Sequence, residues 1–336
     1  MNILILGGEG LVGSSFDYGT KVGRKDADLL KYKEVDKLIK EHNPEWVINC
    51  AGKVGGVKAN IENKFDFFEK NTIININVIK ACMENNVPNL ISFMSTCIFP
   101  DELAQKGRLH ESILHYGEPH QSNYPYAYSK RMVDVMSRIA REKGFNYQCL
   151  IPTNLYGFND NYDLNSSHLI PALIRKVTDA IFGAIMDNKL DEIKFEVWGT
   201  GTPIREFLFA NDIPKIVKYI IDEDLINFEN MIISSVNSYS IADIVGMICL
   251  CFYELIGEKI NLVPVFNSEM PDGQFAKLTD TSKFQILVPI ELTPIKEGLK
   301  ETIKFYLKKV ISENNSRIQV PISLPYYDEF YTNIKD

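Results

Sequence analysis

The chain has 336 residues, of which 45% are hydrophobic and 24% charged, a balance typical of a soluble globular protein with two domains or one large α/β domain. Its formal net charge of −8 argues against a nucleic-acid partner. No apolar run approaches the roughly 18 residues of a membrane span, and the six cysteines show no metal-ligand spacing. We therefore expect a reduced, cytoplasmic protein that binds neither a metal nor a membrane.

Short apolar runs alternate with helix-period segments through the first half of the chain. Four runs predict buried strands, at 2–6, 46–51, 90–94 and 147–151. The longer periodic segments predict helices, at 32–41, 62–85, 124–143, 167–186, 212–221, 241–255 and 295–309. Strands that alternate with helices predict an α/β fold of the Rossmann type, with a doubly wound parallel sheet.

In the second half of the chain, the predicted strands and helices are separated by longer loops. We assign 1–155 to an NADP-binding Rossmann domain, to which later segments return. Residues 156–311 then form mainly a smaller α/β substrate-binding lobe at the carboxyl ends of the strands. The tail, 312–336, has polar and proline-aromatic stretches, and we expect it to lie as a strap over the surface.

A glycine turn, Gly7-x-x-Gly10-x-x-Gly13, follows the first predicted strand directly. Glycines at this place let the backbone turn tightly and approach a pyrophosphate, which then faces free N–H groups at the next helix. We therefore assign dinucleotide binding to this turn and to Leu11 and Val12 within it. A glycine turn without a ligand is the structural alternative.

The stretch that follows the turn is unusually short. Residues 14–23 must hold the rest of the first helix, a loop and the second strand, although a mean helix alone takes about 11 residues. No acidic residue ends a clear second strand, where a reader of the NAD 2′-hydroxyl would lie. Arg24 and Lys25 stand there instead, with Asp28 close behind, and cations near the ribose favour the 2′-phosphate of NADP(H). Two solvated surface cations are the alternative.

Ser95, Tyr126 and Lys130 form the candidate catalytic set. Ser95 follows the strand at 90–94, while Tyr126 and Lys130 are four residues apart on a predicted helix and face one way. The ammonium of Lys130 and an oxidised nicotinamide would both favour the phenolate, so Tyr126 can act as the acid when a ketone is reduced. Ser95 can donate a hydrogen bond to the same oxygen.

Seven stretches run in a familiar order over the chain up to about residue 309. They are 51–56 (AGKVGG), 95–100 (STCIFP), 126–132 (YAYSKRM), 152–157 (PTNLYG), 167–173 (SHLIPAL), 198–207 (WGTGTPIREF) and 271–273 (PDG). On these stretches the chain resembles the extended short-chain dehydrogenase/reductase superfamily. Within it, the chain is similar to the GDP-L-fucose synthase family, NADPH-dependent 3,5-epimerases and 4-reductases of GDP-4-keto-6-deoxymannose.

The resemblance implies roles at the matching positions. Cys97 would be the base and His168 the acid for epimerisation beside the 4-keto group, and Lys130 would also bind the nicotinamide ribose. The implied NADP site comprises Ala51, Gly52, Phe93, Met94, Ser95, Thr96, Tyr126, Lys130, Pro152, Thr153, Asn154, Leu155 and His168. The implied contacts to the nucleotide-sugar are Lys176, Trp198, Arg205 and Asp272. A homodimer is also implied, with the helices at 62–85 and 124–143 as its interface.

The residues themselves support these roles in part and leave alternatives open. A proton alpha to a ketone is acidic enough for a positioned thiolate, but Cys97 can equally be a small buried residue at the start of a loop. His168 can touch only structure or cofactor. Arg205 suits a diphosphate, but it can also form a surface salt bridge. The other histidines, His42, His110, His115 and His120, look solvated and receive no role.

The sequence thus predicts an NADPH-dependent enzyme that reduces the C4 keto group of a GDP-4-keto(-6-deoxy) sugar, mannose- or heptose-derived, with possible C3/C5 epimerisation. Two alternatives stay open: a reductase only, acting on a GDP-4-keto-heptose in surface-polysaccharide biosynthesis, and a nucleotide-sugar 4-epimerase with bound NAD. A 4,6-dehydratase is disfavoured, because Thr96-Cys97 stands where such enzymes carry an Asp-Glu pair. A non-catalytic NADP sensor is disfavoured by the intact catalytic set.

Overall fold

The structure is a computed structural model, and it describes residues 1–314 except 188, 228, 258–259 and 271. Most of the predicted tail strap, 315–336, and Pro271 of the PDG stretch therefore lie outside the described residues. None of the described helices is long and apolar enough to cross a membrane. The described part also holds no group of three or more His, Cys, Asp and Glu side chains suited to a metal, and all six cysteines are free.

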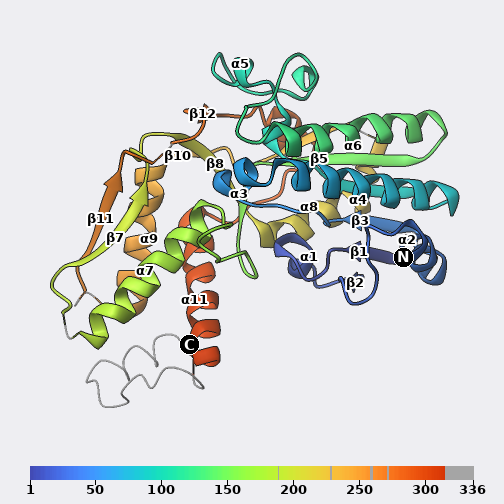
Figure 1. The fold of residues 1–336 in the computed structure, drawn as a ribbon. Coiled ribbons are helices and arrows are strands. Elements are labelled where there is room, and N and C mark those ends of the chain that lie inside the picture. Colours follow the sequence, from blue (N-terminus) through green and yellow to red (C-terminus); the bar gives the residue numbers. More distant parts are fainter. Residues whose placement is uncertain (188, 228, 258–259, 271, 315–336) are drawn as a thin grey trace.

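A parallel sheet of six strands in the order β2-β1-β3-β4-β5-β9 forms the centre of the first half of the molecule (Figure 1). Its strands are β1 (Ile3–Leu6), β2 (Thr20–Val22), β3 (Trp46–Asn49), β4 (Asn89–Phe93), β5 (Asn146–Pro152) and β9 (Met231–Ile233). The predicted α/β fold of the Rossmann type is confirmed. β9 comes from the second half of the chain and completes this sheet.

Successive side chains of a strand point to opposite faces of the sheet, so each strand contributes to the apolar cores on both faces. In β1, Leu4 and Leu6 belong to the core on one face, whereas Ile3 and Ile5 belong to the core on the other. The first face is covered by the helices α2 (Tyr32–His42), α4 (Lys64–Glu84) and α6 (Tyr124–Glu142). The second face is covered by α8 (Ile213–Asp222) and α10 (Ser282–Leu287).

A second lobe has its own core between helices and short strands. β7 (Ile193–Trp198) pairs in parallel with β11 (Leu262–Asn267), and β8 (Ile204–Phe209) pairs with β6 (Asn154–Tyr156), β10 (Ser238–Ser240) and β12 (Ala276–Lys277). The helices of this lobe are α7 (Leu169–Met186), α9 (Ile241–Ile256) and α11 (Ile295–Asn314). A capping box of Ser240 and Asp243 fixes the start of α9.

Short elements connect these layers near the carboxyl ends of the sheet strands. They are α1 (Leu11–Ser15), α3 (Val57–Glu62), α5 (Asp101–Ala104) and the 3-10 turns η1 (Thr96–Ile98), η2 (Glu111–Ile113), η3 (Ala210–Asp212) and η4 (Leu225–Asn227). The predicted helices agree with the observed ones to within a few residues, except that α11 runs five residues beyond the expected end at 309. α1 has only five residues, as the short stretch at 14–23 requires.

A buried carboxylate, Asp134, ties α6 to the loop before it and to β9. Its oxygens lie 2.7 Å from His115 Nε2, 3.0 Å from Arg138 Nη2 and 2.6 Å from Asn230 Nδ2, and its side chain has no exposed surface. His115 is exposed, as expected, but its imidazole also binds this carboxylate. No local sequence pattern indicates this contact, since the partners come from three separate segments.

Replacing Asp134 with Ala is expected to lower the free energy of unfolding by about 1–3 kcal/mol, because the change leaves the buried Asn230 amide without its acceptor and removes two ion pairs to exposed cations. Denaturant unfolding measures the effect. The matched control is Asp222→Ala, which removes an exposed carboxylate 2.8 Å from Lys218 and is expected to cost at most about 1 kcal/mol. Equal losses for the two variants would contradict a structural role for the buried cluster.

Candidate active site

The glycine turn forms a cradle at the carboxyl end of β1. Gly7 has a φ of 77°, and a Cβ there would lie 2.9 Å from Ala51 Cα. A Cβ on Gly13 would lie 2.2 Å from the carbonyl oxygen of Gly7. The backbone can therefore take this path only with glycine at both positions, and its close approach to the next βα turn suits a bound pyrophosphate. The fit supports the predicted dinucleotide site at Gly7, Gly10, Leu11, Val12 and Gly13.

The predicted adenosine end of the site is formed by the residues after β2. Arg24 and Lys25 are exposed, and neither has a carboxylate within 4.0 Å among the described residues. Asp28 instead stabilises a turn: its Oδ1 accepts the N–H of Leu30 at 3.1 Å, and its Oδ2 lies 3.5 Å from Lys31 Nζ. The two cations are thus available to an anion, whereas the carboxylate of Asp28 is engaged locally.

The loop after β3 adds a residue that sequence reasoning missed, Lys53. Asn71 holds this loop to α4, because its amide accepts the N–H of Lys53 and donates to its carbonyl, both at 2.9 Å. The ammonium of Lys53 pairs with Asp66 and lies 5.2 Å from the centre of the Phe67 ring. Burial lowers its pKa, and the positive charges of Lys70 and Arg24 lower it further. Its place beside Gly52 in a matching stretch was the available signal.

Ser95 and Cys97 stand just beyond the carboxyl end of β4. Ser95 is the N-cap of η1, and its hydroxyl oxygen accepts the backbone N–H of Cys97 at 3.5 Å. The thiol of Cys97 donates to the same oxygen over 3.1 Å. Cys97 is buried, while Ser95 and the half-buried Tyr126 retain some exposure. The serine hydroxyl and the thiol are therefore direct neighbours, as their spacing predicts.

The helix α6 presents Tyr126 and Lys130 to the same region. Lys130 is buried, donates from Nζ to the Phe93 carbonyl at 3.0 Å, and has its Nζ 5.9 Å from the centre of the Tyr126 ring. A Cβ on Gly52 would lie 3.4 Å from the same nitrogen. Lys130 thus connects the end of β4, the loop after β3 and the candidate catalytic tyrosine.

The protonation of this pair departs from the expectation drawn from the sequence. Burial lowers the pKa of Lys130 to about 8. Burial also raises the pKa of Tyr126, and the nearby Cys97 adds to the rise. In the protein alone, loss of hydration therefore acts against the expected downward shift, which also depended on the charge of an oxidised nicotinamide. Tyr126 is held as a neutral phenol, the form that can donate a proton.

Contacts of Phe67 and of the loop at Gly55 and Gly56 link the segment before His168 to the catalytic helix α6. The ring of Phe67 lies 6.3 Å from the Tyr126 ring in an edge-to-face arrangement, and a Cβ on Gly55 would lie 3.1 Å from its Cζ. The N–H of Gly56 donates to the carbonyl of Ser166 at 2.9 Å. His168 is the N-cap residue of α7 and is exposed. Partial loss of hydration nevertheless lowers the pKa of its imidazole.

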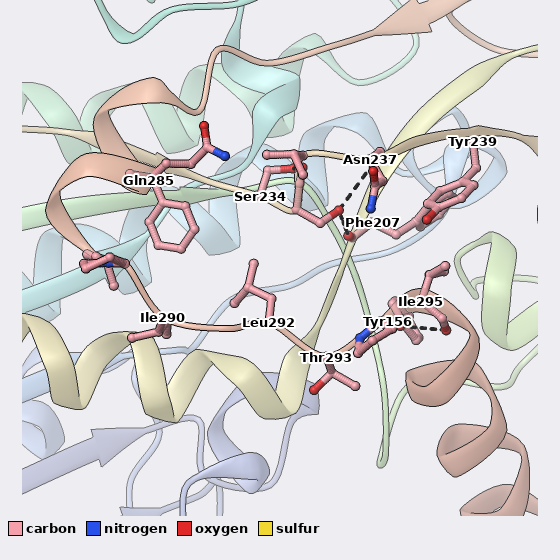
Figure 2. Close-up of a pocket in the computed structure, with 16 residues that line it drawn as sticks. Tyr156, Phe207, Ser234, Asn237, Tyr239, Gln285, Ile290, Leu292, Thr293 and Ile295 are labelled. Atoms are coloured by element: carbon pink, nitrogen blue, oxygen red, sulfur yellow. Dashed lines mark hydrogen bonds between the residues drawn. The ribbon is translucent and has the colours of Figure 1, made fainter.

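The segment 152–155 adjoins both lobes. Thr153 donates its hydroxyl to Ser234 at 3.1 Å, and Asn154 donates from its amide to the Glu206 carbonyl at 2.7 Å. Ser234 also forms part of the wall of a cavity of about 400 Å³, whose lining residues are drawn in Figure 2. None of the predicted site residues lines this cavity, so it is separate from the candidate active site.

Two groups of predicted substrate contacts lie in the second lobe. In the first, Lys176 Nζ lies 3.4 Å from Glu196 Oε2 and 5.0 Å from the centre of the Trp198 ring. The indole N–H of Trp198 donates to the same carboxylate at 2.9 Å. The lysine, the indole and Glu196, which the sequence had not singled out, therefore form one cluster at the end of β7.

The second group surrounds Arg205 on β8. Its guanidinium donates to backbone carbonyls of Ile204, Gln274 and Phe275, and burial lowers its pKa to about 10 although Asp272 acts to raise it. Asp272 in turn accepts the Thr200 N–H at 2.7 Å, directly after Trp198-Gly199. The two groups are thus joined through the turn after β7. Lys277 pairs in register with Arg205 and is a further cation that sequence reasoning missed.

Comparison with known proteins agrees with this geometry. Residues 3–231 match the model of the NAD dependent epimerase/dehydratase family. The chain belongs to this family. Among its relatives, a GDP-L-fucose synthase of Dictyostelium discoideum is 35% identical over 323 residues, which cover 91% of this chain and 95% of the relative. A probable GDP-L-fucose synthase of Drosophila melanogaster is 30% identical and covers 91% and 97% of the two chains.

Solved structures of this family superpose over most of the chain. A GDP-L-fucose synthetase of Naegleria fowleri bound to NADP has a TM-score of 0.77 at 29% identity, over 92% of this chain and 95% of the other. A GDP-6-OMe-4-keto-L-xylo-heptose reductase from C. jejuni has a TM-score of 0.79 at 25% identity, over 92% and 98%. The resemblance drawn from the sequence motifs is confirmed.

Proposed function

We propose that this protein reduces the C4 keto group of a GDP-4-keto sugar with NADPH. The observation that carries the proposal is that Lys130, near the Tyr126 ring, binds the Phe93 carbonyl at the carboxyl end of β4, two residues before Ser95 and beside the loop that adjoins the glycine cradle. The similarity to GDP-L-fucose synthases over nine-tenths of the chain supports the choice of sugar nucleotide. The NADP bound to the Naegleria fowleri structure supports the coenzyme.

In the proposed reaction the bound coenzyme supplies the hydride, and the chain supplies the proton and the binding. Tyr126, held neutral by burial, donates its proton to the oxygen formed at C4. The Ser95 hydroxyl binds the same oxygen, and it already accepts hydrogen bonds from Cys97. Lys130, fixed to the Phe93 carbonyl, places a positive charge near the phenol as the proton leaves.

Epimerisation at C3 and C5 is proposed as a second activity of the same site. Cys97 would remove a proton beside the ketone, and His168 would return one. The thiol lies 3.1 Å from the Ser95 oxygen, so a base at this sulfur would reach carbons that flank the carbonyl held by Ser95. The imidazolium form of His168 would return the proton and become neutral imidazole, and the lowered pKa of His168 makes the imidazolium a minority at physiological pH.

The nucleotide-sugar would lie against the second lobe. We assign its contacts to Lys176, Trp198, Arg205 and Asp272, which the turn after β7 brings together. A 6-deoxyhexose and a heptose are both candidates, because a GDP-4-keto-heptose reductase superposes as closely as the fucose enzymes. The assay is NADPH oxidation with GDP-4-keto-6-deoxymannose or the corresponding GDP-4-keto-heptose. Oxidation with neither sugar would contradict the proposal.

An apolar stripe on α6 and α4 supports a homodimer. On α6 the exposed side chains recur at helical spacing, at Tyr124, Tyr128, Met132, Val135 and Ile139. On α4, which packs beside α6, Phe65 is 73% exposed and Phe68 and Ile76 are also exposed. A second copy of the chain that covers this stripe would form a four-helix interface.

Replacing Met132 with Glu is expected to convert the dimer to a monomer, because the change places a charge in the centre of the apolar stripe. Light scattering after size exclusion measures the mass in solution. Lys37→Gln, which also lowers the charge by one unit but on the exposed surface of α2, is the control and is expected to leave the dimer intact. A monomeric parent protein, or a dimeric Met132→Glu variant, would contradict the assignment of this surface.

A further inference from the structure

We infer that Glu9, in the glycine turn, lowers the preference of the site for NADPH over NADH. The inference rests on the proposed function and concerns the adenosine end of the same site. The sequence places Arg24 and Lys25 at the end of the second strand and no acid there. The structure brings in an acid from a different element.

The glycine turn lies against the end of β2, and this contact places Glu9. The N–H of Gly8 donates to the carbonyl of Val22, the last residue of β2, at 2.8 Å. A Cβ on the next residue, Gly23, would lie 2.6 Å from Glu9 Cδ and 2.7 Å from Glu9 Oε2. The carboxyl group of Glu9 therefore takes the space that a side chain on residue 23 would occupy.

This is the position that distinguishes the two coenzymes in Rossmann folds. An acid at the end of the second strand accepts a hydrogen bond from the 2′-hydroxyl of NAD, and a cation nearby accommodates the 2′-phosphate of NADP. Here the strand ends at Val22 and is followed by Gly23 and Arg24, the arrangement that suits the phosphate. Glu9 places a carboxylate at the same point, although it belongs to the glycine turn and not to the end of β2.

Charged side chains of both signs surround the end of β2. Arg24 and Lys25 are exposed and without a carboxylate within 4.0 Å in the described part of the chain, and Glu9 is also exposed. Lys53 is close enough for Arg24 to lower its pKa, but its own ammonium is paired with Asp66. An incoming 2′-phosphate would meet two free cations and two carboxylates, those of Glu9 and of Asp26, whose Oδ2 accepts the Gly23 N–H at 2.7 Å. The cations favour NADPH, and Glu9 opposes its phosphate while offering an acceptor to the hydroxyl of NADH.

Binding of the two reduced coenzymes tests the inference without any turnover. The purified protein and its Glu9→Gln variant are titrated with NADPH and with NADH, and coenzyme fluorescence reports the dissociation constants. Glu9→Gln is expected to tighten NADPH binding by about fivefold or more at low salt, with no gain for NADH. The gain is expected to shrink as salt is added, because exposed charges are screened. Asp17→Asn, which removes an exposed carboxylate at the opposite end of β2, is the matched control.

The outcomes separate this inference from the function on which it rests. A Glu9→Gln variant whose NADPH to NADH ratio changes no more than that of Asp17→Asn would overturn the role of Glu9 alone. A variant that binds NADPH more weakly than the parent would overturn it as well. A parent protein that binds neither coenzyme would contradict the proposed reductase, and the role of Glu9 would fall with it.

Discussion

Replacing Tyr126 with Phe is expected to reduce the rate of NADPH-dependent ketone reduction by about 10²–10⁴-fold, the contribution of a positioned general acid. The ring, its edge contact with Phe67 and the neighbouring Lys130 all remain, so coenzyme binding is expected to be unchanged. Single-turnover oxidation of NADPH measures the loss, and coenzyme titration measures binding. The two readouts separate a lost proton donor from a damaged site.

Tyr128→Phe is the matched control, because it removes a phenolic hydroxyl from the same helix, on the apolar stripe proposed for the dimer and away from the catalytic set. A pH profile adds an independent readout. Since burial lowers the pKa of Lys130 to about 8, its positive charge is present below that pH and is lost above it. The reduction rate of the parent is therefore expected to fall above about pH 8. A Tyr126→Phe variant as active as Tyr128→Phe would remove Tyr126 from the mechanism.

Replacing Cys97 with Ser is expected to abolish proton exchange at C3 and C5 while ketone reduction continues. A serine hydroxyl preserves the size of the side chain and a hydrogen bond to Ser95, but it is far less acidic than a thiol. Deuterium uptake from deuterated water into these carbons is expected to fall by about 10²-fold or more, the range for loss of a general base. Mass spectrometry of the product measures the uptake.

Cys249→Ser, on α9 of the second lobe, is the control for this change. A Cys97→Ser variant that still exchanges both protons would exclude the thiol as the base. A parent protein that reduces the ketone without any exchange would leave a reductase only, the alternative raised by the heptose reductase among the similar structures.

Local patterns were sufficient to predict most of the fold. The apolar runs at 46–51 and 90–94 became β3 and β4, because a strand buried on both faces reads as a continuous apolar run. The short stretch at 14–23 predicted a compressed first helix, and α1 has five residues. β2 and β9 have only three residues each, too few for a period to be visible, and only their pairing defines them.

The site was predictable where it depends on neighbours in the sequence and less so where it depends on packing. The contact between Ser95 and Cys97 follows from their spacing. The places of Glu9 and Lys53 depend on distant segments that meet only in the fold. Burial raises the pKa of Tyr126 in the protein alone, and the sequence could not indicate this, because a residue pattern gives the charge beside the phenol but not the depth at which the phenol is buried.

Transfer of a labelled hydride tests the central claim most directly. The protein is incubated with GDP-4-keto-6-deoxymannose, or with the corresponding GDP-4-keto-heptose, and NADPH deuterated at nicotinamide C4. Our interpretation predicts a reduced GDP-sugar that carries the coenzyme's deuterium at sugar C4, and no such product from Tyr126→Phe on the same time scale. Oxidation of NADPH without deuterium at C4, or a labelled product formed equally fast by Tyr126→Phe, would contradict it.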